Sequence, residues 1–257
     1  MSAELPAPEL TGYSDAQRAF AVAAWPLRAA EELRSALIYR ALATASRAAG
    51  MPAPWPARFA EVVRDEVRHA RLCATVGARL GAAAPRYDAR PVRARLAPLA
   101  DPLERTGAIL CAEVAIGETI SMMLFRAGRR ATTEPLTRAA LAAILRDEVR
   151  HQRLGWDGLA ALWPMLDAVR REALQRAAAG ALAASEQQIA LPVLRRLDAG
   201  EPFDPALAEL GVLAPEARVE AFYAAIEQRV VPRLDRIGLD GARAWRDRYR
   251  AAAIGLR

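Results

Sequence analysis

Cysteine is scarce in this sequence, with only Cys73 and Cys111 among 257 residues. Two cysteines are too few for a disulfide framework or for a zinc or rubredoxin-type site built from thiolates, and they fit a reducing compartment. The sequence also lacks a charged and then apolar leader, and no apolar run reaches the ~18 residues of a membrane span. These absences predict a soluble cytoplasmic protein that does not bind a membrane.

Lysine is missing altogether, so all 36 basic residues are arginine, against 30 acidic residues and a net charge of +6. The arginines are scattered over the whole chain, and no basic stretch is interleaved with stacking aromatics. A coding bias accounts for this pattern better than a selected binding face does. Nucleic-acid binding is therefore not predicted.

Residues that favour strands are also sparse, and Ala, Leu, Arg and Glu dominate, which predicts an all-α fold. Glycine and proline divide residues 14–163 into four long helices, expected near 14–49, 56–80, 102–127 and up to 163. The long irregular connection, 81–100, lies between the second and third helices. Short, long and short connections are typical of a four-helix bundle made of two antiparallel hairpins joined by a crossover.

In the remaining residues, 164–257, the sequence pattern predicts a long Ala-rich helix at 166–197 and two amphipathic helices at 215–237 and 240–253. This extension has no metal-ligand pattern. We expect it to pack on the bundle within one structural unit, as a lid over a substrate site or as the surface of a homodimer.

One motif occurs twice, as VVRDEVRHARL at 62–72 and ILRDEVRHQRL at 144–154, with eight of eleven positions identical. The offset of 82 residues (148 − 66) indicates a duplicated helical hairpin. Because Glu and His three positions apart share a helix face, Glu66 with His69 and Glu148 with His151 each form a two-ligand unit. Apolar residues surround both units, so their charges need partners, and divalent cations between the two copies are predicted.

A two-ion site needs further carboxylates, which the duplication helps to locate. Glu31 lies 35 residues before Glu66 (66 − 31), and Glu113 lies 35 residues before Glu148 (148 − 113). Each stands in an otherwise apolar helical stretch. The predicted metal ligands are therefore Glu31, Glu66, His69, Glu113, Glu148 and His151.

Two other glutamates compete for the same role. The shared register favours Glu31 over Glu32, and Glu118 lies about 140° around an ideal helix from Glu113, so both cannot face the metals. Whether Glu32 or Glu118 takes part stays open at this point. Mixed carboxylate and imidazole ligands suit iron or manganese, and zinc is compatible with the same ligand types.

Asp65 and Asp147 directly precede the motif glutamates. Metal-bound histidines usually donate their second ring N–H to a carboxylate, which fixes the tautomer. Arg68 and Arg150 are expected to balance the charge, whereas the alternative for all four residues is an ordinary surface salt bridge. The expected pairs run crosswise between the repeats, Asp65 with His151 and Asp147 with His69.

With these residues, segment 14–163 resembles the ferritin-like di-iron carboxylate superfamily, whose bundles supply one Glu from each of two helices and Glu-x-x-His from the other two. The resemblance implies two iron ions, with manganese or mixed Mn/Fe as alternatives. It also implies an oxygenase or oxidase in which O2 yields a peroxo or high-valent oxidant that attacks a small organic substrate. The electron donor is not identified.

Other activities within this superfamily are less well matched. The position at which radical-storing members carry a tyrosine is Cys73 here, and the cysteine count excludes a rubredoxin domain. An iron-storing or peroxide-removing protein is the first alternative to an oxygenase. A metal-free helical scaffold is the second.

Overall fold

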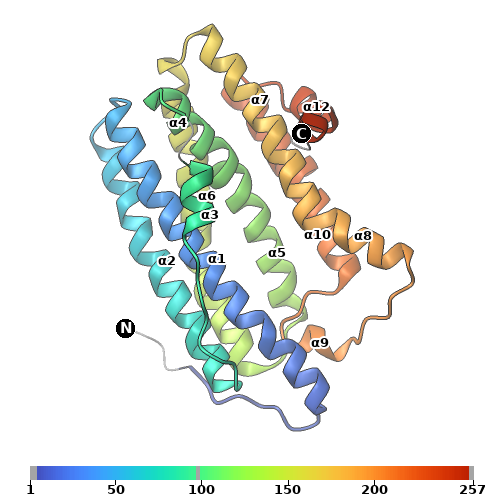
Figure 1. The fold of residues 1–257 in the computed structure, drawn as a ribbon. Coiled ribbons are helices and arrows are strands. Elements are labelled where there is room, and N and C mark those ends of the chain that lie inside the picture. Colours follow the sequence, from blue (N-terminus) through green and yellow to red (C-terminus); the bar gives the residue numbers. More distant parts are fainter. Residues whose placement is uncertain (1–4, 97–98, 255–257) are drawn as a thin grey trace.

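The computed structural model describes residues 5–96 and 99–254, and all regular secondary structure within them is helical. Figure 1 shows a bundle of long helices running side by side, which confirms the predicted all-α bundle. Its four members are α1 (Asp15–Ala48), α2 (Pro54–Arg79), the continuous run of α4 (Pro102–Ala108), η1 (Ile109–Ile116) and α5 (Gly117–Ala131), and α6 (Pro135–Leu162).

Local sequence signals explain where these helices begin. Ser14 caps α1 in a capping box with Gln17, and Asp101 accepts hydrogen bonds from two backbone N–H groups at the start of α4. The connection between α2 and α4, expected to be irregular, contains the short helix α3 (Arg90–Leu96). Pro91 lies in the first turn of α3. Backbone N–H groups in a first turn have no acceptor within the helix, so a proline is tolerated there.

Close packing of the bundle depends on small residues in α6. A Cβ atom on Gly155 would lie 2.7 Å from Cγ1 of Val114, and one on Gly158 would lie 3.0 Å from Phe59. These glycines allow α6 to approach η1 and α2. The π-helical segment η1, with its wider i to i+5 hydrogen bonding, is thereby held against the helix that carries the second motif.

The C-terminal part packs along the α4–η1–α5 helix and lies on one side of the bundle (Figure 1). The expected helix at 166–197 is present but contains a π-helical segment, and one unpredicted short helix, α9 (Ala206–Glu209), follows it before the two expected amphipathic helices. The elements are η2 (Trp163–Met165), α7 (Ala168–Ser185), η3 (Glu186–Ala190), α8 (Leu191–Asp198), α9 (Ala206–Glu209), α10 (Pro215–Ala225), η4 (Ile226–Val230), α11 (Val231–Ile237) and α12 (Gly241–Ile254). A role as a lid or dimer surface stays a prediction.

A buried ion pair fastens the last helix to this layer. Nε of Arg248 on α12 donates to Glu186 Oε2 at 2.8 Å, and the Tyr223 hydroxyl donates to Glu186 Oε1 at 3.0 Å. Both charged residues are buried, so each is satisfied chiefly by the other.

One helical run, Pro102–Ala131, is long and apolar enough to cross a membrane by length and composition. However, 56% of its most apolar stretch is buried inside the protein, where it packs against α6, α7 and α10. Such burial is what a core helix requires, so this run gives no evidence for a membrane span. The cytoplasmic location stays a prediction.

Candidate metal centre

Six buried side chains from four helical segments converge inside the bundle. They form two overlapping groups in which the potential ligand atoms all lie within 4.8 Å of one another. Glu66 belongs to both groups, so two adjacent positions share this carboxylate. One group is Glu32, Glu66, His69 and Glu148, and the other is Glu66, Glu118 and His151.

Both imidazoles direct Nδ1 into this cluster. Nδ1 of His69 lies 3.3 Å from Glu148 Oε1 and 3.6 Å from Glu32 Oε2. Nδ1 of His151 lies 3.0 Å from Glu66 Oε1 and 3.7 Å from Glu148 Oε2. The glutamate and histidine of each motif copy therefore contribute to one centre.

The second nitrogen of each imidazole points outward to an aspartate of the other motif copy. Nε2 of His69 lies 3.1 Å from Asp147 Oδ2, and Nε2 of His151 lies 3.3 Å from Asp65 Oδ2. Because an ionised carboxylate only accepts, these contacts require a ring proton on Nε2. A neutral ring with that proton has its Nδ1 lone pair directed at the cluster, where it could bind a metal ion.

Two arginines complete this outer layer. Arg68 donates to Asp147 at 2.7 Å and pairs with Asp65 at 2.8 Å, while Arg150 pairs with Asp65. Arg68 pairs with Asp147, and Asp65 pairs with Arg150, so a higher residue number on α2 faces a lower one on α6. The helices are antiparallel, and the two motif copies face each other.

The structure does not bring Glu31 and Glu113 into the cluster, which corrects the expectation based on the repeat register. The side chain of Glu31 is 72% exposed and lies 3.6 Å from Arg34. Glu113 accepts a hydrogen bond from the same arginine at 2.7 Å. The buried positions are taken by Glu32 and Glu118 instead.

The repeat register does not lead to the buried glutamates, because the two hairpins differ in length. Glu32 precedes Glu66 by 34 residues (66 − 32), whereas Glu118 precedes Glu148 by 30 (148 − 118), a difference of about one helical turn. Glu113 itself lies within the π-helical segment η1, which ends just before Glu118 and alters the direction in which successive side chains project. The equal spacing of Glu31 and Glu113 from the two motif copies therefore does not correspond to equal positions inside the bundle.

Helical periodicity could have found both residues. Trp25, Ala29, Ala36 and Tyr39 occur at three- and four-residue intervals around Glu32 and are all buried with it. On the third helical run, a similar buried series surrounds Glu118, namely Cys111, Ala115 and Met122.

Burial and the mutual repulsion of the carboxylates shift the pKa values of this cluster. Burial raises the pKa of Glu32 to about 8, and burial together with the neighbouring Glu148 raises the pKa of Glu118 well above its usual range. Burial alone would also raise the pKa of Glu148, but its interactions with His151 and His69 lower it to about 2. Four carboxylates therefore share a space that cannot hold their negative charges without positive ones.

Several potential ligand atoms of the cluster have no hydrogen-bond partner and are free to bind metal ions. Oε1 of Glu66, Oε2 of Glu148 and Nδ1 of both histidines are buried and have no hydrogen-bond partner among the described residues. Leaving several such atoms unpaired is costly, and all of them face one another. Carboxylate oxygen and imidazole nitrogen are ligands that iron and manganese accept, so the donor set fits a pair of divalent cations.

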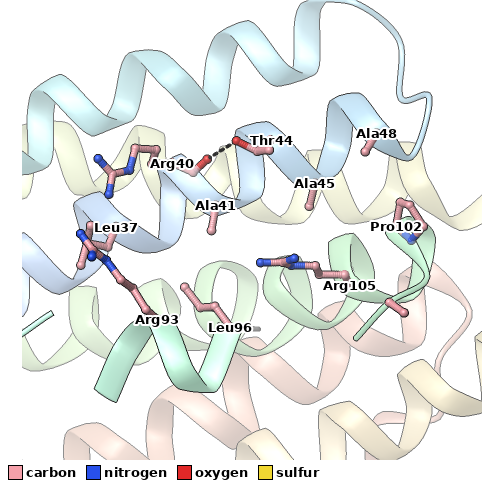
Figure 2. Close-up of a pocket in the computed structure, with 11 residues that line it drawn as sticks. Leu37, Arg40, Ala41, Thr44, Ala45, Ala48, Arg93, Leu96, Pro102 and Arg105 are labelled. Carbon is pink, nitrogen blue, oxygen red and sulfur yellow. Dashed lines mark hydrogen bonds between the residues drawn. The ribbon is translucent and has the colours of Figure 1, made fainter. Parts of the chain in front are cut away.

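A separate groove of about 570 Å³ lies between α1, α3 and α4 and is lined by apolar side chains together with Arg40, Arg93 and Arg105 (Figure 2). Leu37 and Ala41 line it, and they lie about 140° and 180° around an ideal α1 from Glu32. The groove is therefore on the opposite side of α1 from the cluster.

Comparison with known proteins agrees with this geometry. Residues 56–238 match the model of the p-aminobenzoate N-oxygenase AurF family, a range that holds five of the six clustered residues and most of the C-terminal helices. No protein of curated function matches the chain.

Among solved structures, the chain is similar to a Synechococcus protein with aldehyde deformylating oxidase activity, with a TM-score of 0.58 and 19% identity. The match covers 92% of this chain and 98% of that one. At this level of identity, the likeness establishes the shared fold. The family match covers well over half of the sequence, and the chain therefore belongs to the p-aminobenzoate N-oxygenase AurF family of di-iron, ferritin-like oxygenases that act on small organic substrates with O2.

Proposed function

We propose that this chain is a di-iron N-oxygenase of a primary aromatic amine, and that its two iron ions are held by the six clustered residues. The observation that carries the proposal is the converging set of buried, unpaired ligand atoms. The proposed ligands are Glu32, Glu66, His69, Glu118, Glu148 and His151.

Charge balance supports two divalent ions. Four ionised glutamates carry four negative charges, and the histidines are neutral when Nδ1 binds a metal. Two divalent cations would cancel this charge, whereas a single one would leave two buried charges uncompensated. The sharing of Glu66 between the two groups also supports a pair of adjacent ions.

The family description supports an amine as the substrate, because N-oxygenation of p-aminobenzoate is the activity after which the family is named. Bound iron would supply the activation of O2, and the chain supplies the environment. Its buried apolar side chains keep bulk water away from the cluster, and each Asp and His pair holds the ring proton at Nε2 so that Nδ1 stays a ligand.

The test starts with metal-free protein loaded with Fe(II) under nitrogen. We expect two irons per chain, a melting temperature that falls when a chelator removes them, and N-hydroxylated or further oxidised p-aminobenzoate after addition of O2 and a small reductant. The Glu66→Gln variant should lose both metal and product, while Glu61→Gln on the exposed side of α2 should keep them.

Several results would count against the proposal. Many irons per chain in a large hollow particle would indicate storage, and melting unaffected by a chelator would indicate a metal-free scaffold. Two bound irons with oxidation of a long-chain aldehyde but of no aromatic amine would keep the centre and overturn the substrate class.

A further inference from the structure

Oxygenation by a di-metal enzyme needs electrons from outside. When one atom of O2 enters the amine and the other leaves as water, two electrons and two protons must be added. Iron–sulfur clusters are held by cysteine thiolates. In this chain Cys73 and Cys111 are both buried and lie on different helical segments. These two cysteines cannot hold such a cluster, so the electrons must come from a carrier outside these 257 residues.

The candidate metal centre reaches the surface through its outer aspartates. The clustered residues are buried, but the side chains of Asp65 and Asp147 are 12% and 26% exposed. Each aspartate contacts Nε2 of a histidine whose Nδ1 faces the cluster. One imidazole and one carboxylate thus separate the centre from the solvent on the outer face of α2 and α6.

The duplicated motif surrounds this point with arginines. Because α2 and α6 are antiparallel, Arg71 lies level with Arg146, and Arg64 lies level with Arg153. These two pairs lie on either side of the pair formed by Arg68 and Arg150. We call this set the arginine face, and all six side chains are exposed: Arg64, Arg68, Arg71, Arg146, Arg150 and Arg153.

Much of this positive charge is uncompensated. Arg64, Arg71 and Arg146 form no ion pair within residues 5–96 and 99–254, whereas Arg153 lies 3.4 Å from Asp157. Val149, half exposed, adds an apolar contact beside the arginines. An exposed surface of this kind steers and orients a partner of opposite charge.

We propose that the arginine face docks an acidic one-electron carrier protein, which reduces the centre through the histidine and aspartate pairs. This proposal rests on the proposed function. Acidic electron carriers fit both the charge of the face and its position over the centre. A nucleic acid fits less well, because the aromatic side chains of the two motif copies are His69 and His151, and both are buried, so bases could not stack on them.

The test compares two triple variants of the iron-loaded full chain. The first reverses charge on the arginine face (Arg64→Glu, Arg71→Glu and Arg146→Glu) and leaves Arg68 and Arg150 intact, because they contact the aspartates. The second makes the same change in charge on the C-terminal helices (Arg195→Glu, Arg229→Glu and Arg246→Glu), all exposed positions. The probe is an acidic plant-type ferredoxin, and its affinity is measured by calorimetry at low and high salt.

We expect wild-type protein to bind the ferredoxin more weakly at high salt, the arginine-face variant to lose about tenfold or more in affinity, and the C-terminal variant to change by about twofold at most. Equal losses in both variants, no binding by wild type, or lost binding of DNA or anionic vesicles with unchanged ferredoxin binding would overturn the proposal. Reduction by dithionite with a viologen mediator reports on the centre alone, so a failed metal site is recognised separately.

Discussion

Nε2 of His69 on α2 lies 3.1 Å from Oδ2 of Asp147 on α6, so one motif copy orients the imidazole of the other. Asp147→Asn removes the negative charge that holds the ring proton at Nε2. We expect metal affinity to fall by about 10- to 100-fold, the usual effect of losing such a partner. A competition titration against a coloured chelator measures this change.

The control is Asp157→Asn, also on α6, where the aspartate is half exposed and pairs only with Arg153 among the described residues. Its metal affinity should stay within about twofold of wild type, as for other surface ion pairs. Equal affinities for Asp147→Asn and wild type would show that the aspartate does not orient the histidine.

Adjacent glutamates on α1 offer a direct comparison of a buried and an exposed carboxylate. Glu32→Gln should reduce the metal content below two ions per chain, because a neutral amide is a poorer ligand than a carboxylate. Glu31→Gln should leave it unchanged, since that side chain is mostly exposed. Elemental analysis after desalting gives the answer, and the reverse pattern would restore the repeat register as the correct guide.

The third helical run allows the same comparison. Glu118→Gln should lower the metal content, while Glu113→Gln should weaken the contact with Arg34 and keep both ions. Thermal melting of the two variants without metal separates a loss of ligation from a loss of folding. Metal retained in Glu118→Gln and lost in Glu113→Gln would contradict the proposed ligand set.

Gly155 and Gly180 are both inside helices but differ in their surroundings. A Cβ atom on Gly155 would meet Val114 at 2.7 Å and the backbone N of Ala115 at 3.0 Å, so Gly155→Ala should destabilise the fold by about 1–3 kcal/mol. Gly180 has nothing within 4 Å, and Gly180→Ala should stabilise it by about 0.5–1 kcal/mol. Urea unfolding of the metal-free protein measures both, and equal effects would contradict close packing at η1.

The lowered pKa of Asp101 predicts how the stability of the fold changes at acidic pH. Its hydrogen bond with Arg170, and then that from the Glu104 backbone, lower the pKa of Asp101 to about 2. The ordinary value is about 3.9, so its charge contributes stability above about pH 4 that is lost as the pH falls toward 2. Asp101→Asn keeps a helix cap without the charge.

The urea midpoints of wild type and Asp101→Asn should therefore differ most above pH 4 and converge near pH 2. Asp198→Asn, at an exposed position, serves as the control and should follow wild type throughout. A difference that grew as the pH fell would mean that the aspartate charge is not stabilising.

Much of this protein could be predicted from its sequence, because the informative patterns are local. Helix starts follow from caps such as Ser14 and Asp101, and the bundle follows from the order of connection lengths. The Glu-x-x-His copies depend only on spacing within one helix, so their placement needed no knowledge of how helices pack.

The upstream glutamates were harder to place, because the spacing from the motif and the helical periodicity of apolar residues point to different positions. Packing against α2 decides between Glu31 and Glu32, and the π-helical geometry of η1 decides between Glu113 and Glu118. A π-helical segment has no strong composition of its own, because it is stabilised by packing and by the side chains that it orients. The burial periodicity around each glutamate was a better guide than the distance to the motif.

The ion pair that joins Glu186 to Arg248 limits how this chain can be shortened. A version ending before Gly241 would leave the Glu186 carboxylate in the interior with the Tyr223 hydroxyl but without its guanidinium. An unpaired buried charge costs several kcal/mol, so such a fragment would aggregate or melt early for a reason unrelated to iron. Expression trials should therefore retain α12 and carry any affinity tag at the opposite end of the chain.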